Sequence, residues 1–130
     1  MIDHVAIRTR HIAEALQFYD AAIAALGGGV KLDFPKEQND GRAERIYGRD
    51  VLSFGLIEVD ANAPDGLPVH LAFSARTHAE VDAFYKAAMA AGGRDNGGPG
   101  PRPQYGENCY AAFVFDPDGN NIEAVCFTPE

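Results

Sequence analysis

The sequence predicts a single α+β domain of two tandem βαβββ repeats, which together form a curved mixed sheet. Two observations predict this fold. A segment of the chain recurs after a constant shift, and each copy passes from a period of two to a helical period. The length agrees, because 130 residues with 46% hydrophobic content are enough for one core but too few for two independent domains.

The recurring segment is the strongest of these signals. Residues 4–27 match residues 70–93 at half of their positions without a gap, a shift of 66 from His4 to His70. Alanine supplies half of the identities, but the others include histidine, arginine, glutamate, phenylalanine, tyrosine and glycine. We therefore interpret the chain as an internal duplication, with repeats at about 1–60 and 68–130.

Each repeat begins with a strand and continues with a helix. Residues 3–7 and 69–73 carry bulky apolar side chains at every second position, which indicates strands. Helical spacing of apolar residues follows in both repeats. Thr77 and Glu80 have the spacing of a capping box at the start of the second helix. Glycines, which accept positive φ, end the two helices at 27–29 and 92–93.

Shorter strands complete each repeat. They are expected at 30–34, 44–47 and 51–59 in the first repeat, and near Arg94, at 109–115 and at 121–127 in the second. The segment 60–68 is rich in Pro, Gly, Asp and Asn and is expected to connect the repeats. Asp116 to Gly119 is expected to form a tight hairpin turn, and 97–103 a loop at the rim of a pocket.

The alternation of side chains predicts where the two strand histidines point. Val5 and Ile7 share the face that packs beneath the helix, so His4 projects from the opposite face. The second repeat places His70 in the same way. If both helices cover one side of a curled sheet, both imidazoles lie on its inner surface.

Glu123 supplies a carboxylate to the same region. It shares one face of the last strand with Val125 and Phe127. An unpaired buried charge is costly there unless it reaches solvent, a cation or a metal. Two neutral imidazoles and one carboxylate can hold one divalent transition metal, Zn, Ni, Mn, Co or Fe, with positions open for substrate. The sequence thus predicts a metal site of His4, His70 and Glu123. The alternative is two satisfied core histidines and a solvated glutamate.

Other candidate ligands receive weaker interpretations. Glu58 lies one residue from position 57, which the shift of 66 aligns with Glu123, so it is either a fourth ligand or a solvated strand end. Cys109 and Cys126 lack paired metal or redox spacing and are expected in the core. We expect the remaining histidines, His11 and His78, at the surface near the helix starts, without a role.

Charge and hydropathy exclude several classes of partner. The net charge is −8 and the eleven Lys and Arg residues form no cluster, which argues against binding to nucleic acid or a membrane surface. No stretch approaches the roughly 18 to 20 apolar residues of a membrane helix, and no basic leader precedes an apolar run. A cytoplasmic location is the expectation.

Four motifs resemble those of the vicinal oxygen chelate superfamily, which contains glyoxalase I, extradiol dioxygenases, fosfomycin resistance enzymes and bleomycin resistance proteins. The resemblance covers nearly the whole chain. The motifs are Ile2-Asp3-His4-Val5, Phe18-Tyr19-Asp20, Val69-His70-Leu71-Ala72-Phe73 and Asp116-Pro117-Asp118-Gly119-Asn120-Asn121-Ile122-Glu123. The last is the most specific, because Asp-Pro-Asp-Gly followed by Ile-Glu typically enters the family's final, metal-bearing strand.

The resemblance implies the glyoxalase/bleomycin resistance/dioxygenase fold, with metal ligands on the first, fifth and last strands at His4, His70 and Glu123. It implies a glyoxalase-like lyase or isomerase that acts on a small substrate with adjacent oxygens through a metal-stabilised enediolate, with Glu123 or a bound water moving the proton. It further implies a homodimer, whose interface can complete the cup. The candidate pocket walls, or else ordinary core and rim aromatics, are Tyr47, Phe54, Tyr105 and Tyr110.

Two other functions stay open. An extradiol ring-cleaving dioxygenase also uses two histidines and one carboxylate, around iron. A metal-free small-molecule binding or resistance protein is the third hypothesis, since the acidic surface could attract a cationic drug. The presence of all three candidate ligands argues against the third hypothesis, because binding alone would not need them.

Overall fold

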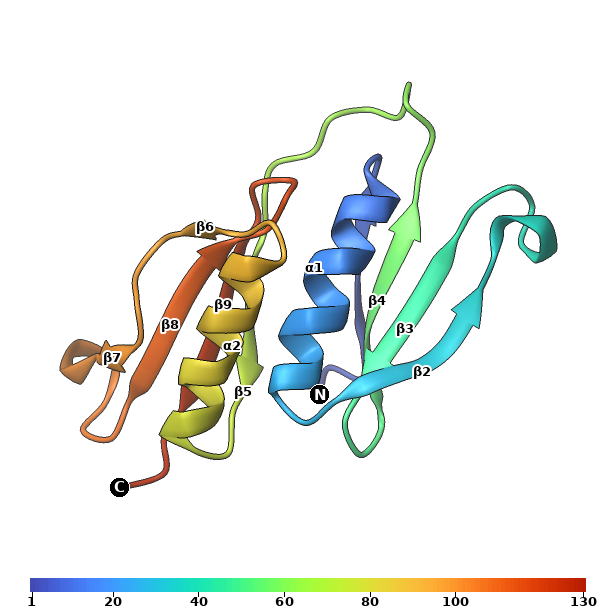
Figure 1. The fold of residues 1–130 in the computed structure, drawn as a ribbon. Helices are drawn as coiled ribbons and strands as arrows, with labels where there is room; N and C mark the ends of the chain where they lie inside the picture. Colours follow the sequence, from blue (N-terminus) through green and yellow to red (C-terminus); the bar gives the residue numbers. More distant parts are fainter.

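Two βαβββ modules lie side by side in the computed structural model, which describes all residues, 1–130 (Figure 1). The first contains β1 (Val5–Thr9), α1 (Ile12–Ala25), β2 (Gly29–Phe34), the 3₁₀ turn Lys36–Gln38, β3 (Glu44–Gly48) and β4 (Leu52–Glu58). The second contains β5 (His70–Ser74), α2 (His78–Ala90), β6 (Arg94–Asp95), β7 (Gly100–Pro101), the 3₁₀ turn Pro103–Tyr105, β8 (Tyr110–Phe115) and β9 (Asn121–Cys126). Residues 59–69 connect the modules without a helix or strand.

Each module builds its own mixed sheet, which confirms the predicted fold class. The strand orders are β1-β4-β3-β2 and β5-β9-β8-β6, with β7 added to β8. In both sheets the first strand pairs in parallel with the last strand of its module. The sheet is divided rather than continuous, because β1 and β5 share no ladder hydrogen bonds. Helices α1 and α2 pack against each other on one side of the two sheets, so the opposite sheet faces stay open (Figure 1).

The helices form where amphipathic spacing and end signals agree. Helix α1 buries Phe18, Tyr19 and Ala22, which recur every three or four residues. Helix α2 begins at Thr77, whose Oγ1 accepts the backbone N–H of Glu80 at 3.1 Å, as the sequence predicted. The reciprocal half of the capping box is missing, because the Glu80 carboxylate accepts from the N–H of Arg76 instead, at 2.7 Å.

A buried carboxylate in the β8–β9 turn joins the two modules. Asp116 is 2% exposed and accepts hydrogen bonds from the Tyr19 hydroxyl of α1 at 2.6 Å, from two backbone N–H groups and from the Asn120 amide. Burial first, and then the Asp116 charge, raise the pKa of Tyr19, so this hydroxyl stays a donor. Beside it, Thr9 of β1 donates to Asp118 at 2.6 Å. The turn therefore forms a polar link between the modules.

Candidate metal site

His70 lies on the open face of the second sheet, and His4 lies just before β1, in line with the open face of the first sheet. In β1, Ile7 and Thr9 are buried beneath the helix, whereas Ala6 on the alternate face is exposed and His4 continues that face just before the strand. In β5, His70, Ala72 and Ser74 are exposed in the same alternation.

His70 and Glu123 come into direct contact. Strand β9 runs parallel to β5 with Glu123 opposite Ala72, and this register places the carboxylate beside the histidine. His70 Nε2 lies 3.0 Å from Glu123 Oε2, where the His70 side chain is 50% exposed and that of Glu123 only 12%. His70 Nδ1 lies 3.0 Å from the Asn121 carbonyl oxygen, which can accept its N–H. Nε2 can then bind a cation in the neutral ring, or donate to the Glu123 carboxylate in the protonated ring.

His4 stands apart from this pair. Its Nδ1 lies 2.7 Å from Asp3 Oδ1, and its side chain is 63% exposed. The ligand atoms of His4, His70 and Glu123 do not lie within 4.8 Å of one another. A single chain thus brings two of the three expected ligands together and presents the third on the open face of the other module.

The strand registers show which residue of the first module corresponds to Glu123. Ala6 pairs with Gly55 in the way that Ala72 pairs with Glu123, so the equivalent position is Gly55 rather than position 57. The constant shift of 66 fails here because the two modules differ in chain length between helix and last strand. The first module therefore offers no carboxylate at this position.

Glu58 has partners of its own. It lies three residues beyond Gly55, on the other face of β4. Its carboxylate is 2.8 Å from Lys36 Nζ and accepts the backbone N–H of Ala43 at 3.0 Å. The hydrogen bond from Lys36 is the main cause that lowers the pKa of Glu58. Glu58 thus forms an ion pair with Lys36 at the end of β4 and does not lie beside His70 and Glu123.

Two further side chains surround the pair, and the sequence analysis missed both. Phe113 of β8 lies opposite Glu123 in the β8–β9 ladder and stacks on His70 at 6.2 Å between ring centroids. The Arg102 guanidinium lies over the ring of Phe113, 5.6 Å from the ring centroid. Arg102 belongs to the loop 97–103 that was expected to form a pocket rim, and it places a positive charge over the Phe113 ring.

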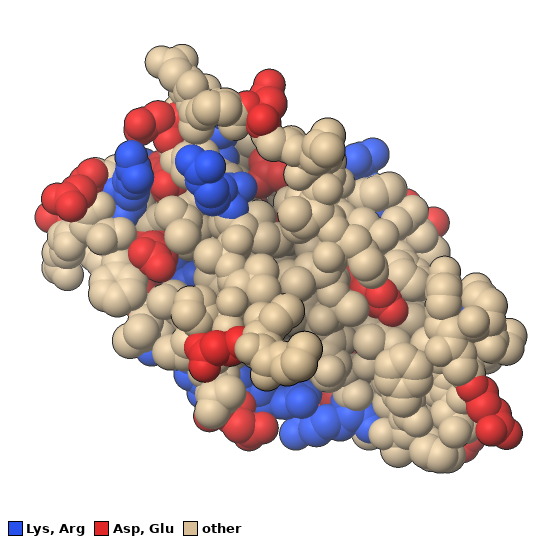
Figure 2. All heavy atoms as spheres, turned by 180° about the vertical axis from the view of Figure 1, so that it is seen from behind, with Lys and Arg blue, Asp and Glu red and all other residues tan.

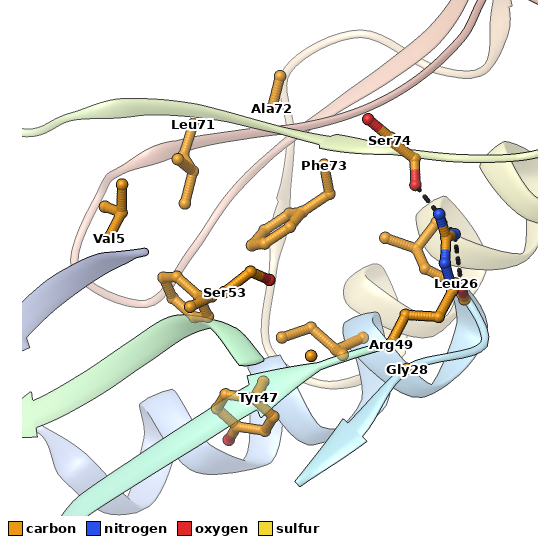
Figure 3. Close-up of a pocket in the computed structure, with 13 residues that line it drawn as sticks. Val5, Leu26, Gly28, Tyr47, Arg49, Ser53, Leu71, Ala72, Phe73 and Ser74 are labelled. Atoms are coloured by element: carbon orange, nitrogen blue, oxygen red, sulfur yellow. Dashed lines mark hydrogen bonds between the residues drawn. The ribbon is translucent and has the colours of Figure 1, made fainter. Parts of the chain in front are cut away.

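A separate cavity of about 280 Å³ lies between the modules (Figure 3). Tyr47 and Phe54, which were expected as walls of a substrate pocket, line this separate cavity, and Phe73 of β5 meets Phe54 edge-on at 5.3 Å between centroids. Arg49 closes one end by donating to the carbonyl oxygens of Leu26 and Ser74, both at 3.3 Å. Burial is the main cause that raises the pKa of Tyr47. The hydrogen bond that the Tyr47 hydroxyl donates to Asp20 raises this pKa further.

The other two predicted wall residues lie elsewhere. Tyr105 is 63% exposed in the turn after β7, and Tyr110 donates to Asp82 at 2.8 Å. Tyr110 also stacks on His78 with ring centroids 4.0 Å apart. His78 was expected at the surface, but its Nε2 atom is buried beneath this contact.

Uncharged side chains cover the middle of the face seen from behind, while Lys and Arg gather towards its edges (Figure 2). On the open side of the first sheet, Leu32, Ile46, Gly55 and Ala6 pair in one row across all four strands. Leu32 and Phe34 are 44% and 38% exposed. This apolar sheet face lies uncovered in the single chain.

The chain belongs to the Glyoxalase/Bleomycin resistance protein/Dioxygenase superfamily, whose sequence profile matches residues 1–124. It is similar to a glyoxalase/bleomycin resistance protein from Albidiferax ferrireducens T118, with 25% identity, a TM-score of 0.72, and coverage of 95% of this chain and 96% of that one. A family enzyme from Burkholderia phytofirmans PsJN is 20% identical, with a TM-score of 0.69 and 98% of both chains covered.

An E144Q mutant of glyoxalase I from Zea mays has the same fold, with 20% identity and a TM-score of 0.67 over 95% of this chain and 46% of the maize chain. No curated protein matches the sequence. Neither helix has the length and apolar character needed to cross a membrane.

Proposed function

We propose that the protein is a metal-dependent, glyoxalase-like lyase or isomerase that works as a homodimer. His70 and Glu123 of one chain and His4 of a second chain would hold one divalent transition metal, Zn, Ni, Mn, Co or Fe. The observation that carries this proposal is the 3.0 Å contact between His70 Nε2 and Glu123 Oε2 on an open sheet face.

The donor set fits such an ion. Both histidines have Nδ1 beside an acceptor, the Asn121 carbonyl oxygen for His70 and the Asp3 carboxylate for His4. Contacts of this kind fix the ring and leave Nε2 as the ligand atom. With glycine at position 55, the protein supplies two nitrogens and one carboxylate, which leaves coordination positions for a substrate.

A second copy of the chain is the natural source of the missing histidine. His4 is exposed, and the apolar row of the first sheet lies uncovered beside it. In a twofold dimer the same patch serves both chains, so the first module of each chain can face the second module of the other. Such a dimer has two identical sites, and each takes residues from both chains.

The side chains around the pair suit a small substrate with adjacent oxygens. A bound metal ion would polarise those oxygens and stabilise negative charge on them. The Glu123 carboxylate is then placed to take a proton from the carbon next to a carbonyl and return it to the neighbouring carbon. Phe113 supplies an apolar wall, and Arg102 can pair with an anionic group of the substrate.

An extradiol dioxygenase is the second candidate, because two histidines and one carboxylate without a fourth acid also make the facial triad of iron(II) oxygenases. Gly55 favours this reading, since the first module adds no carboxylate. Oxygen consumption with a catechol, under iron(II) and in the absence of any lyase activity with 2-oxo compounds, would select it.

Metal analysis of the purified protein tests the common part of both candidates. We expect about one transition metal ion per chain at the three-ligand site of the open face, and at least about a tenfold loss of affinity at that site in Glu123→Gln. Glu58→Gln is the matched control, because its carboxylate is paired with Lys36, and it should keep the metal. Equal metal content in parent and Glu123→Gln would contradict the proposal.

A further inference from the structure

We propose that His78, Cys126 and Glu130 form a second metal site, which binds zinc and fastens the segment 127–130 to the start of α2. One ligand atom from each residue, an imidazole nitrogen, the thiol sulfur and a carboxylate oxygen, lie within 4.8 Å of one another. Three different metal-binding groups from separate parts of the second module thus converge at one point.

This cluster is separate from the His70–Glu123 pair. Cys126 ends β9 and is fully buried on the side that packs against the helices. Glu123 lies on the same strand but on its other, open face, because the two residues are three positions apart. A metal bound by Cys126 therefore cannot be the ion proposed for the open face.

The imidazole of His78 points to a missing ligand. Its Nε2 is buried and has no hydrogen-bond partner, although a buried polar atom without a partner is costly. Glu130 Oε2 lies 3.7 Å from it, too far for a hydrogen bond but suitable for two ligands of one ion. Stacking on Tyr110, with the rings 9° from parallel, holds the imidazole in place.

The other two groups are also held in position. Glu130 Oε2 accepts the backbone N–H of His78 at 2.6 Å, which anchors the carboxylate at the start of α2. Cys126 Sγ accepts the N–H of Thr128 at 3.4 Å, a contact that stabilises a thiolate. Both contacts orient the ligand groups without occupying all of their lone pairs.

Zinc suits this donor set best. A thiolate, an imidazole and a carboxylate are all zinc ligands, and a water molecule can fill the fourth position. With bonds of about 2.0 to 2.3 Å, tetrahedral ligands stand roughly 3.3 to 3.8 Å apart, so a shift of about 1 Å or less closes the site. Binding releases the thiol proton of Cys126 to solvent, and affinity should therefore rise with pH.

Titration of the full chain with cobalt(II) tests this site directly, because a thiolate bound to cobalt gives a charge-transfer band in the near ultraviolet. We expect the band in the parent protein and its loss in Cys126→Ala. Cys109→Ala is the matched control, since Cys109 is the other buried free cysteine and lies outside the cluster. Glu123→Gln should keep the band, which separates this test from that of the proposed function.

Glu130→Ala gives a second test that does not depend on a core substitution. Its side chain is 40% exposed, so the variant should fold normally and lose cobalt affinity by at least about tenfold. A charge-transfer band that survives in Cys126→Ala or disappears in Cys109→Ala would overturn the proposal. Unchanged cobalt affinity in Glu130→Ala would remove Glu130 from the ligand set.

Discussion

The two modules follow the same path, yet they differ at one equivalent position of their last strands. Next to Ala72, the second module has Glu123, and next to Ala6 the first module has Gly55. Both copies keep the histidine two residues earlier, at His70 and His4. The two modules thus share the scaffold and a histidine, but only the second combines a histidine with an acid.

The open faces differ in character as well. The first module presents a row of small and apolar residues, with Leu32 and Ile46 beside Gly55. The second presents His70, Asn121 and Glu123 with Phe113 beneath them. The first face is therefore mainly apolar, whereas the second carries polar and ionisable side chains, and the proposed shared site would combine the two.

Removing Asp116 should have the largest effect, because this carboxylate links the modules. Asp116→Ala leaves the buried Tyr19 hydroxyl and the Asn120 amide without their acceptor. We expect a loss of about 3 kcal/mol in the free energy of unfolding, measured by urea denaturation at pH 7. Asp60→Ala, an exposed residue of the connector, should change it by less than about 0.5 kcal/mol. A loss below about 1 kcal/mol in Asp116→Ala would show that the modules do not depend on this link.

The next test introduces an acid into the first module at position 55. A Cβ atom at Gly55 would meet Ala6 Cβ at 3.5 Å, and Ala6 Cα and Ile46 Cγ1 both at 3.9 Å, which are ordinary van der Waals contacts, so a side chain fits on the open face. Gly55→Glu should make the two modules alike and supply a fourth ligand, which we expect to raise metal affinity about tenfold. Isothermal titration of the metal-free protein measures this change, with Gly55→Gln as the control. An unchanged affinity would mean that position 55 does not face the metal.

The smallest effect concerns Glu58, the acid of the first module that lies outside the site. Its pKa is lowered in the folded state, mainly by the Lys36 hydrogen bond. The resulting stability is therefore present above the ordinary pKa of a glutamate and disappears as the pH falls through the lowered value. Lys36→Gln should slightly lower the free energy of unfolding at pH 7 and leave it almost unchanged at pH 2, as measured by urea denaturation at the two pH values. An equal cost at both pH values would contradict the ion-pair explanation.

The sequence predicted much of the fold because the relevant signals are local. Alternation in β1 and β5 is enough to place His4 and His70 on the faces away from the helices, and Thr77 is enough to begin α2. Phe113 could also have been found, since Phe113 and Glu123 each lie five residues from Asp118 in a tight hairpin. Counting across the turn predicts their pairing.

Other features depend on distances that the sequence does not contain. The alignment of Glu123 with position 57 was wrong because a constant shift ignores the different loop lengths, and only the strand register identifies Gly55. The division into two sheets and the separation of His4 from His70 arise from how the modules pack through their helices. His78 was missed because its burial comes from Tyr110, far away in the chain.

Mixing two defective variants tests most directly whether the site is shared between chains. His4→Ala and Glu123→Ala should each lose the open-face metal ion. After they are unfolded and refolded together in equal amounts, half of the dimers contain one chain of each kind, and each such dimer regains one intact site. At the open-face site, the mixture should therefore bind about a quarter of the metal that the parent binds there. No recovery above the separate variants, or full metal binding by His4→Ala alone, would contradict a site built from two chains.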